Sequence, residues 1–167
     1  SLGGYYATFT EFLGFKPYMN EGKMMGLAAY GKYSKNIQKK LDKFINYNRL
    51  TGSFKINNKL RYDGKHSYGV RFTDDFVKIF GNKRDQNISA LTQPYPDIAF
   101  NVQFRLEEIV KLLAKNLYKQ NKIRDFCLEG GVAMNCKMNG ELGKEKYIKN
   151  IFIQPAASDN GVALGAA

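Results

Sequence analysis

Apolar residues recur at intervals of three and four along much of the chain, which is the spacing of one buried helix face. This pattern predicts helices over residues 4–13, 21–29, 34–47 and 74–80, and a longer one over 97–120 that follows Pro96. The first predicted core face consists of Tyr5, Phe9, Phe12 and Leu13. The core face of the longest helix consists of Ile98, Val102, Leu106, Ile109, Leu113 and Leu117.

The last third of the chain alternates between short apolar runs and helical patterns. Strands are predicted over 124–128 and 150–154, with a helix over 131–142 between them and another over 159–167 after them. A helix that connects neighbouring strands of one sheet requires the strands to be parallel, with both following turns at the same edge. The order therefore indicates an α/β fold.

The middle of the chain is more polar and richer in turn-forming residues. Residues 54–62 alternate in character around Asn57 and Asn58, which predicts a small hairpin. We therefore divide the chain into a helical segment at 1–47, a polar insert subdomain with a hairpin at 48–96, and an α/β core at 97–167.

Composition narrows the class of protein. The net charge is +11, but the lysines are scattered and only Lys39 and Lys40 are adjacent, so we predict a solvated basic surface and no nucleic-acid partner. No apolar run approaches the roughly 18 residues of a membrane span, and the first residues lack a secretory pattern. The spacing of Cys127 and Cys136 fits no metal or redox motif, so we expect buried, reduced thiols in a cytoplasmic protein.

Polar or small residues follow both strands of the predicted core. Gly130 and Gly131 end the first strand and open a helix, where free N–H groups and the helix dipole favour a phosphate, and Asn135 follows within reach of a base or ribose. The competing interpretation is that the glycines only permit close packing of strand and helix. Asp159 follows the second strand, where a carboxylate either caps the last helix or binds a hard cation or iron.

Three motifs carry a resemblance to a known family. They are Gly130-Gly131-Val132-Ala133-x-Asn135, Ser158-Asp159-Asn160-Gly161, and the segment from Glu21 to Gly31 that reads EGKMMGLAAYG. In this order, which spans the whole chain, they resemble the O-carbamoyltransferases that include the nodulation protein NodU and the cephamycin carbamoyltransferase. The resemblance implies the actin-like ATPase superfamily (ASKHA) fold, with a ribonuclease-H-like subdomain of parallel strands flanked by helices.

The resemblance also implies a reaction. In the family, a C-terminal domain similar to YrdC makes carbamoyl-adenylate from carbamoyl phosphate and ATP. The domain that this chain resembles then moves the carbamoyl group to a hydroxyl of a small acceptor such as a sugar, an antibiotic or a nodulation factor. Carbamoyl phosphate, ATP and a hydroxyl-bearing acceptor are thus the expected partners, without nucleic acid or membrane.

Site residues carried over from the family fall into two groups. Nucleotide or carbamoyl-adenylate would contact Glu21, Lys23, Gly26, Gly130, Gly131 and Asn135. A divalent metal, expected to be Fe(2+), would be held by Asp159 and two histidines of a His-x-x-x-His motif upstream of this chain. For Lys23, a phosphate-facing role competes with a simple surface role beside core Met24, Met25 and Leu27.

The single histidine, His66, lies in the polar insert and is read as a solvated loop residue. The chain is therefore expected to be an interior part of a longer enzyme and inactive alone. Two alternatives stay open. One is a protein like the tRNA threonylcarbamoyltransferases, which share the Gly-Gly and Asp-Asn-Gly elements, although the long motif from Glu21 favours the small-acceptor family. The other is a noncatalytic nucleotide-binding or interaction module.

Overall fold

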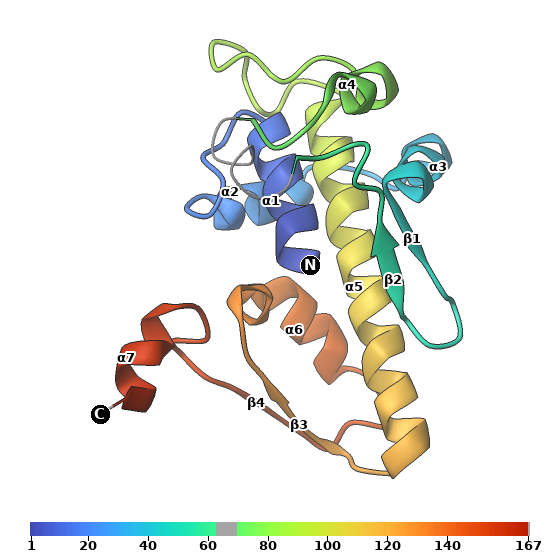
Figure 1. Cartoon of the computed structure of the whole chain (residues 1–167), viewed down its shortest axis with the longest axis vertical. Coiled ribbons are helices and arrows are strands. Elements are labelled where there is room, and N and C mark those ends of the chain that lie inside the picture. The colour runs from blue at the N-terminus through green and yellow to red at the C-terminus, as the bar shows by residue number, and fades with distance from the viewer. Residues whose placement is uncertain (63–69, 167) are drawn as a thin grey trace. The chain divides into compact units, whose positions relative to one another are not determined.

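The computed structural model describes residues 1–62 and 70–166, which form a mixed α/β chain with two small sheets (Figure 1). Contacts divide the chain into two compact units, Ser1–Tyr47 with Phe54–Arg105, and Asn48–Ser53 with Leu106–Ala167. His66 lies outside the described residues. The division into helical segment, insert and core stays a prediction, because compactness does not decide which segment is an insertion.

The first unit is mainly helical and contains the predicted helices near the chain start. Its elements are α1 (Leu2–Phe12), α2 (Glu21–Ala28), α3 (Lys35–Phe44), β1 (Ile45–Tyr47), β2 (Phe54–Ile56), α4 (Asp74–Phe80) and the beginning of α5 (Tyr95–Asn121). Ser1 caps α1 by accepting a hydrogen bond from the Gly4 N–H, and Thr73 caps α4 in the same way from Phe76. The helices predicted at 4–13, 21–29 and 74–80 are confirmed.

Aromatic side chains form the core of the first unit. The Phe9 ring lies 5.5 Å from Phe44, 5.2 Å from Phe76 and 5.1 Å from Phe80 between ring centroids. These edge-on and tilted arrangements are those that aromatic quadrupoles favour. The predicted core face of α1 is confirmed, since Tyr5, Phe9, Phe12 and Leu13 are all buried.

The helix predicted over 34–47 ends three residues early, and the predicted hairpin is wrong in its strands. Ile45 adopts an extended conformation, and β1 pairs antiparallel with β2 in the register Ile45↔Ile56 to Tyr47↔Phe54. Asn57 and Asn58 therefore lie after the hairpin and not at its turn. The alternation in 54–62 belongs to one strand only, because the partner of β2 is Ile45–Tyr47, whose apolar residues continue the helical spacing of α3.

A buried cation joins α3 to α5 inside the first unit. The Arg105 guanidinium is 2% exposed, lies 2.9 Å from Asp42 Oδ1 and donates to Gln38 Oε1 at 2.6 Å. Its carbon Cζ also lies 4.9 Å from the centroid of the Tyr47 ring. A buried charge must be paired in this way, so the network fixes the packing of α3 on α5.

The second unit contains the α/β part. It comprises most of α5, β3 (Asp125–Leu128), a 3-10 turn (Gly131–Met134), α6 (Cys136–Gly143), β4 (Asn150–Ile153) and α7 (Asn160–Ala166). β3 and β4 are parallel neighbours in the register Asp125↔Asn150 to Leu128↔Ile153, as Figure 1 shows. The prediction of parallel strands with both turns at one edge is confirmed.

One face of the β3–β4 pair is exposed. Cys127 and Phe152 are register partners on that face, and Phe152 is 60% exposed. The expectation of buried cysteines is wrong, because both Cys127 and Cys136 are exposed. The lack of a metal or redox motif does not place a cysteine in the core: Cys127 lies on the exposed face of its strand, and Phe126 and Ile151 on the other face are half-buried.

The end of α5 is less buried than its start. Ile98 to Ile109 of the predicted stripe are buried, whereas Leu117 is 51% exposed. The Tyr147 hydroxyl donates to the Lys111 carbonyl at 2.9 Å, and burial, with a smaller effect of Glu145, raises the pKa of Tyr147 to about 12.

Among the described helices, none combines the length and the apolar character that a membrane span requires.

Candidate functional site

The turn after β3 contains a position whose backbone conformation is easily adopted only by glycine. Gly130 has φ 87° and ψ 165°, a conformation that side chains with a Cβ rarely adopt. Its N–H donates to the Ala157 carbonyl at 2.8 Å. The loop after β3 and the loop after β4 are thus joined by a backbone hydrogen bond at one edge of the sheet.

The space around the paired glycines is open. A Cβ built on Gly130 or on Gly131 would meet no atom within 4 Å. The interpretation that these glycines serve close strand–helix packing is therefore not supported. The first residues of a helical turn leave N–H groups without intrahelical acceptors, here those of Gly131 and Val132. An open turn with free donors is suited to an anionic group such as a phosphate.

The predicted helix over 131–142 is broken at Asn135. Residues Gly131–Met134 form a 3-10 turn, Asn135 is extended at φ −75° and ψ 91°, and α6 begins at Cys136. The Asn135 Oδ1 accepts a hydrogen bond from the Met138 N–H at 2.9 Å, so Asn135 caps α6. The prediction that Asn135 lies one turn inside a helix is therefore wrong. That its side-chain amide binds a ligand stays a prediction.

Asp159 lies in the loop after β4, immediately before α7, and its side chain is exposed. The Val162 N–H donates to the Asp159 carbonyl at 3.1 Å, and the Gly161 N–H donates to the Ser158 carbonyl at 2.9 Å. An exposed carboxylate here is compatible with both the capping and the metal interpretation. Within the described ranges, no three His, Cys, Asp or Glu side chains gather in a way that could hold a metal ion.

The remaining predicted residues lie on α2, in the first unit. Lys23 and Gly26 are exposed, whereas Met24 and Leu27 are buried. The Glu21 carboxylate accepts a hydrogen bond from the Tyr18 N–H at 2.6 Å, which orders the entry into α2. The predicted core role is confirmed for Met24 and Leu27, whereas Met25 is half-buried. The exposure of Lys23 is compatible with both its ligand role and its surface role.

Gly31, the last residue of the EGKMMGLAAYG motif, has a different function. A Cβ at this position would lie 2.0 Å from the Pro96 carbonyl oxygen and 2.8 Å from the Phe100 Cβ. Only glycine allows this close approach to the start of α5. This end of the motif is therefore explained by packing in the first unit, whereas Gly26 faces open space.

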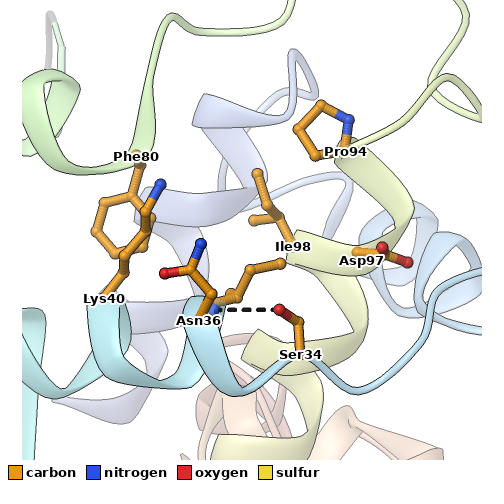
Figure 2. Close-up of a pocket in the computed structure, with 8 residues that line it drawn as sticks. Ser34, Asn36, Lys40, Phe80, Pro94, Asp97 and Ile98 are labelled. Atoms are coloured by element: carbon orange, nitrogen blue, oxygen red, sulfur yellow. Dashed lines mark hydrogen bonds between the residues drawn. The ribbon is translucent and has the colours of Figure 1, made fainter.

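The first unit also contains a small pocket of about 260 Å³ between α3, α4 and the start of α5. Figure 2 shows Lys40, Phe80 and Ile98 around it. The Ser34 Oγ already accepts from the Ile37 N–H, and the Asp97 Oδ1 accepts from the Lys32 N–H at 2.9 Å. These two polar groups therefore serve the fold, and the pocket contains none of the predicted residues.

Sequence reasoning missed Asn139, which lies within α6. Its amide N–H donates to the Ala133 carbonyl in the glycine turn at 2.7 Å. Its Oδ1 is buried and accepts no hydrogen bond from any described residue. The sequence signal was an asparagine near the middle of a short helix, where its low helix propensity calls for an explanation.

Comparisons with known proteins cover the whole chain. The sequence profile of the family described as "Carbamoyltransferase N-terminus" matches residues 1–167. An uncharacterized protein of Synechocystis is 40% identical over an alignment of 168 positions, which covers all of this chain and 26% of that protein. Nodulation protein NolO of Bradyrhizobium diazoefficiens is 34% identical over an alignment of 173 positions, which covers all of this chain and 28% of NolO.

Nodulation protein NolNO of Sinorhizobium fredii is 32% identical over 167 residues, again all of this chain but 22% of the relative. The chain thus spans about a quarter of the length of the curated relatives that it matches. The match over the full chain agrees with the three motifs and with the parallel strands that carry two of them. The chain belongs to the carbamoyltransferase N-terminal family.

Proposed function

We propose that the protein containing this chain is an O-carbamoyltransferase, and that the chain supplies part of the surface that binds carbamoyl-adenylate. The observation that carries this proposal is the open glycine turn at Gly130 and Gly131, in a chain whose family is that of carbamoyltransferases. The ribonuclease-H-like fold of the actin-like ATPases is part of the same proposal. Its support here is the parallel pair of strands with a helical crossover.

In this proposal the glycine turn receives the phosphate of the adenylate. The N–H groups of Gly131 and Val132 would donate to phosphate oxygens, and the missing side chains would let the ligand approach the backbone. The hydrogen bond from Gly130 to Ala157 would keep the second loop near the same ligand. Lys23 of α2, in the first unit, stays a predicted ligand contact, and it is exposed.

The transfer step is an exchange at the carbamoyl carbon. The acceptor oxygen forms a bond to that carbon, the bond from that carbon to the adenylate phosphate oxygen breaks, AMP leaves with that oxygen, and the hydroxyl proton of the acceptor passes to solvent. N–H donors near the leaving phosphate favour this step by stabilising the charge that develops on AMP.

The proposed metal fits the donor that this chain presents. An exposed carboxylate such as Asp159 is a hard oxygen ligand that suits Fe(2+) or another divalent ion. Asp159 would hold the ion together with histidines from elsewhere in the longer protein. When bound, such an ion supplies Lewis acidity toward a carbonyl oxygen.

The test uses the full-length protein with ATP, isotopically labelled carbamoyl phosphate and a panel of small hydroxyl-bearing acceptors. We expect AMP formation that depends on carbamoyl phosphate, and a product that carries the labelled carbamoyl group by mass spectrometry. A reaction without ATP serves as the control for transfer directly from carbamoyl phosphate. Absence of AMP and of labelled product with every acceptor would overturn the proposal.

A further inference from the structure

The 3-10 turn that forms the candidate site is weakly held by its own hydrogen bonds. The Ala133 N–H donates to the Gly130 carbonyl at 2.9 Å, and the Asn135 N–H donates to the Val132 carbonyl at 3.0 Å. Such 3-10 hydrogen bonds have poorer geometry than those of an α-helix, and they are few in a turn of four residues. Gly131 also lacks a side chain that could pack. An additional contact is therefore needed to fix the direction of the N–H groups.

The Asn139 side chain makes such a contact. Its amide donates to the Ala133 carbonyl at 2.7 Å, which is the shorter end of the normal range. Ala133 itself is 3% exposed, so the hydrogen bond acts on the buried residue of the turn. The helix that carries Asn139 is anchored by Met138 and Leu142, which are 2% and 0% exposed. The hydrogen bond from the Asn139 amide thus connects the turn to the well-packed helix α6.

The other half of the Asn139 amide has the opposite effect on stability. Its Oδ1 is buried without a hydrogen-bond donor among the described residues. Burying an unsatisfied acceptor is unfavourable, and leucine, with a similar volume, would not have this cost. Asn139→Leu therefore removes one favourable hydrogen bond and one unfavourable buried oxygen together, so its effect on global stability is small.

We infer that Asn139 is a positioning residue, which holds the N–H groups of Gly131 and Val132 in the orientation that an anionic ligand requires. This inference rests on the proposed function for the identity of the ligand. The orientation of the turn itself does not depend on that identity. Positioning and ligand binding can therefore be tested separately in one experiment.

The experiment follows hydrogen exchange of the peptide spanning residues 129–136 in the full-length protein. In Asn139→Leu we expect exchange in this peptide to rise about tenfold without ligand, which corresponds to about 1.4 kcal/mol of local stability, with the thermal midpoint nearly unchanged. The matched control is Asn121→Leu, because Asn121 also donates from its side-chain amide to a backbone carbonyl, that of Leu117, away from the turn. The control should leave this peptide unchanged.

ATP is then added as the probe. We expect ATP to slow exchange of the wild-type peptide, and Asn139→Leu to need about tenfold more ATP for the same protection. Asn139→Met, which also lacks the amide donor and carries no charge, should behave likewise and replaces the leucine variant if that variant does not fold. Unchanged exchange in both variants would overturn the inference. Faster exchange in the variants, without ATP protection of the wild type, would support positioning and reject the nucleotide assignment.

Discussion

Two glycines of the EGKMMGLAAYG motif, five positions apart, should respond oppositely to the same substitution. In Gly31→Ala the new Cβ would lie 2.0 Å from the Pro96 oxygen and 2.5 Å from the Pro96 carbon, so backbone at the start of α5 must move by about 1 Å. Overpacking of this kind costs about 1–3 kcal/mol, and the rigid carbonyl places this case in the upper part of that range. In Gly26→Ala no atom lies within 4 Å of the Cβ, and helix propensity favours alanine by up to about 1 kcal/mol.

Native-state hydrogen exchange in α2 and at the start of α5 measures both effects in the full-length protein. We expect faster exchange by at least about tenfold in Gly31→Ala, since 1.4 kcal/mol corresponds to a factor of ten, and slower exchange in Gly26→Ala. Because Gly26 is also a predicted ligand contact, Gly26→Ala should lower carbamoyl transfer despite its greater stability. Equal exchange in the two variants, or protection in Gly31→Ala, would refute the packing argument.

Three further predictions concern single residues. Gly131→Val should keep the fold, because the space is open, but should weaken ATP binding in calorimetric titration; Gly140→Val, also in open space, is the control, and unchanged affinity would reject the site. Asp159→Asn keeps a capping side chain, so stability should change by only a few tenths of a kcal/mol, while metal content and transfer fall about tenfold; normal metal content and turnover together would favour capping. Tyr147→Phe removes the hydrogen bond to Lys111.

For Tyr147 the pH dependence has a definite sign. The folded-state pKa is raised from 10.0 to about 12, so the unfolded chain loses its phenol proton first as the pH rises. The stability that comes from the protonated phenol is fully present below pH 10 and is lost between 10 and about 12. The stability difference between wild type and Tyr147→Phe, from denaturation at several pH values, should shrink across that window. A constant difference would contradict the assigned cause.

The sequence predicts the parts of the fold in which one signal acts alone. The parallel pairing of β3 and β4 follows from the crossover helix, and the core face of α1 follows from helical spacing. The failures occur where two signals compete. Ile45 continues the apolar spacing of α3 yet pairs as a strand, and Asn135 interrupts a helical pattern because its side chain is a better cap than interior residue. Such choices depend on partners distant in sequence or on side-chain geometry.

For the candidate site, the sequence identifies the residue types but not the atoms that surround them. Gly130, Gly131 and Asp159 were located correctly in the loops after the two strands. The distinction between glycines in open space and Gly31 against Pro96 required atomic positions. Asn139 was missed because its contact with Ala133 joins two elements that periodicity merges into one helix.

The hydrogen bond from Gly130 to Ala157 has a consequence for how mutations combine. Residues that share a network of contacts show interaction free energies of about 0.5–3 kcal/mol in double-mutant cycles, whereas distant residues are additive. The loops after β3 and β4 should therefore behave as one energetic unit, although about 25 residues separate them in the chain. A substitution that destabilises one loop already removes part of the stabilisation that a substitution in the other loop would remove. The free-energy loss of the double variant should therefore be smaller than the sum of the losses of the two single variants.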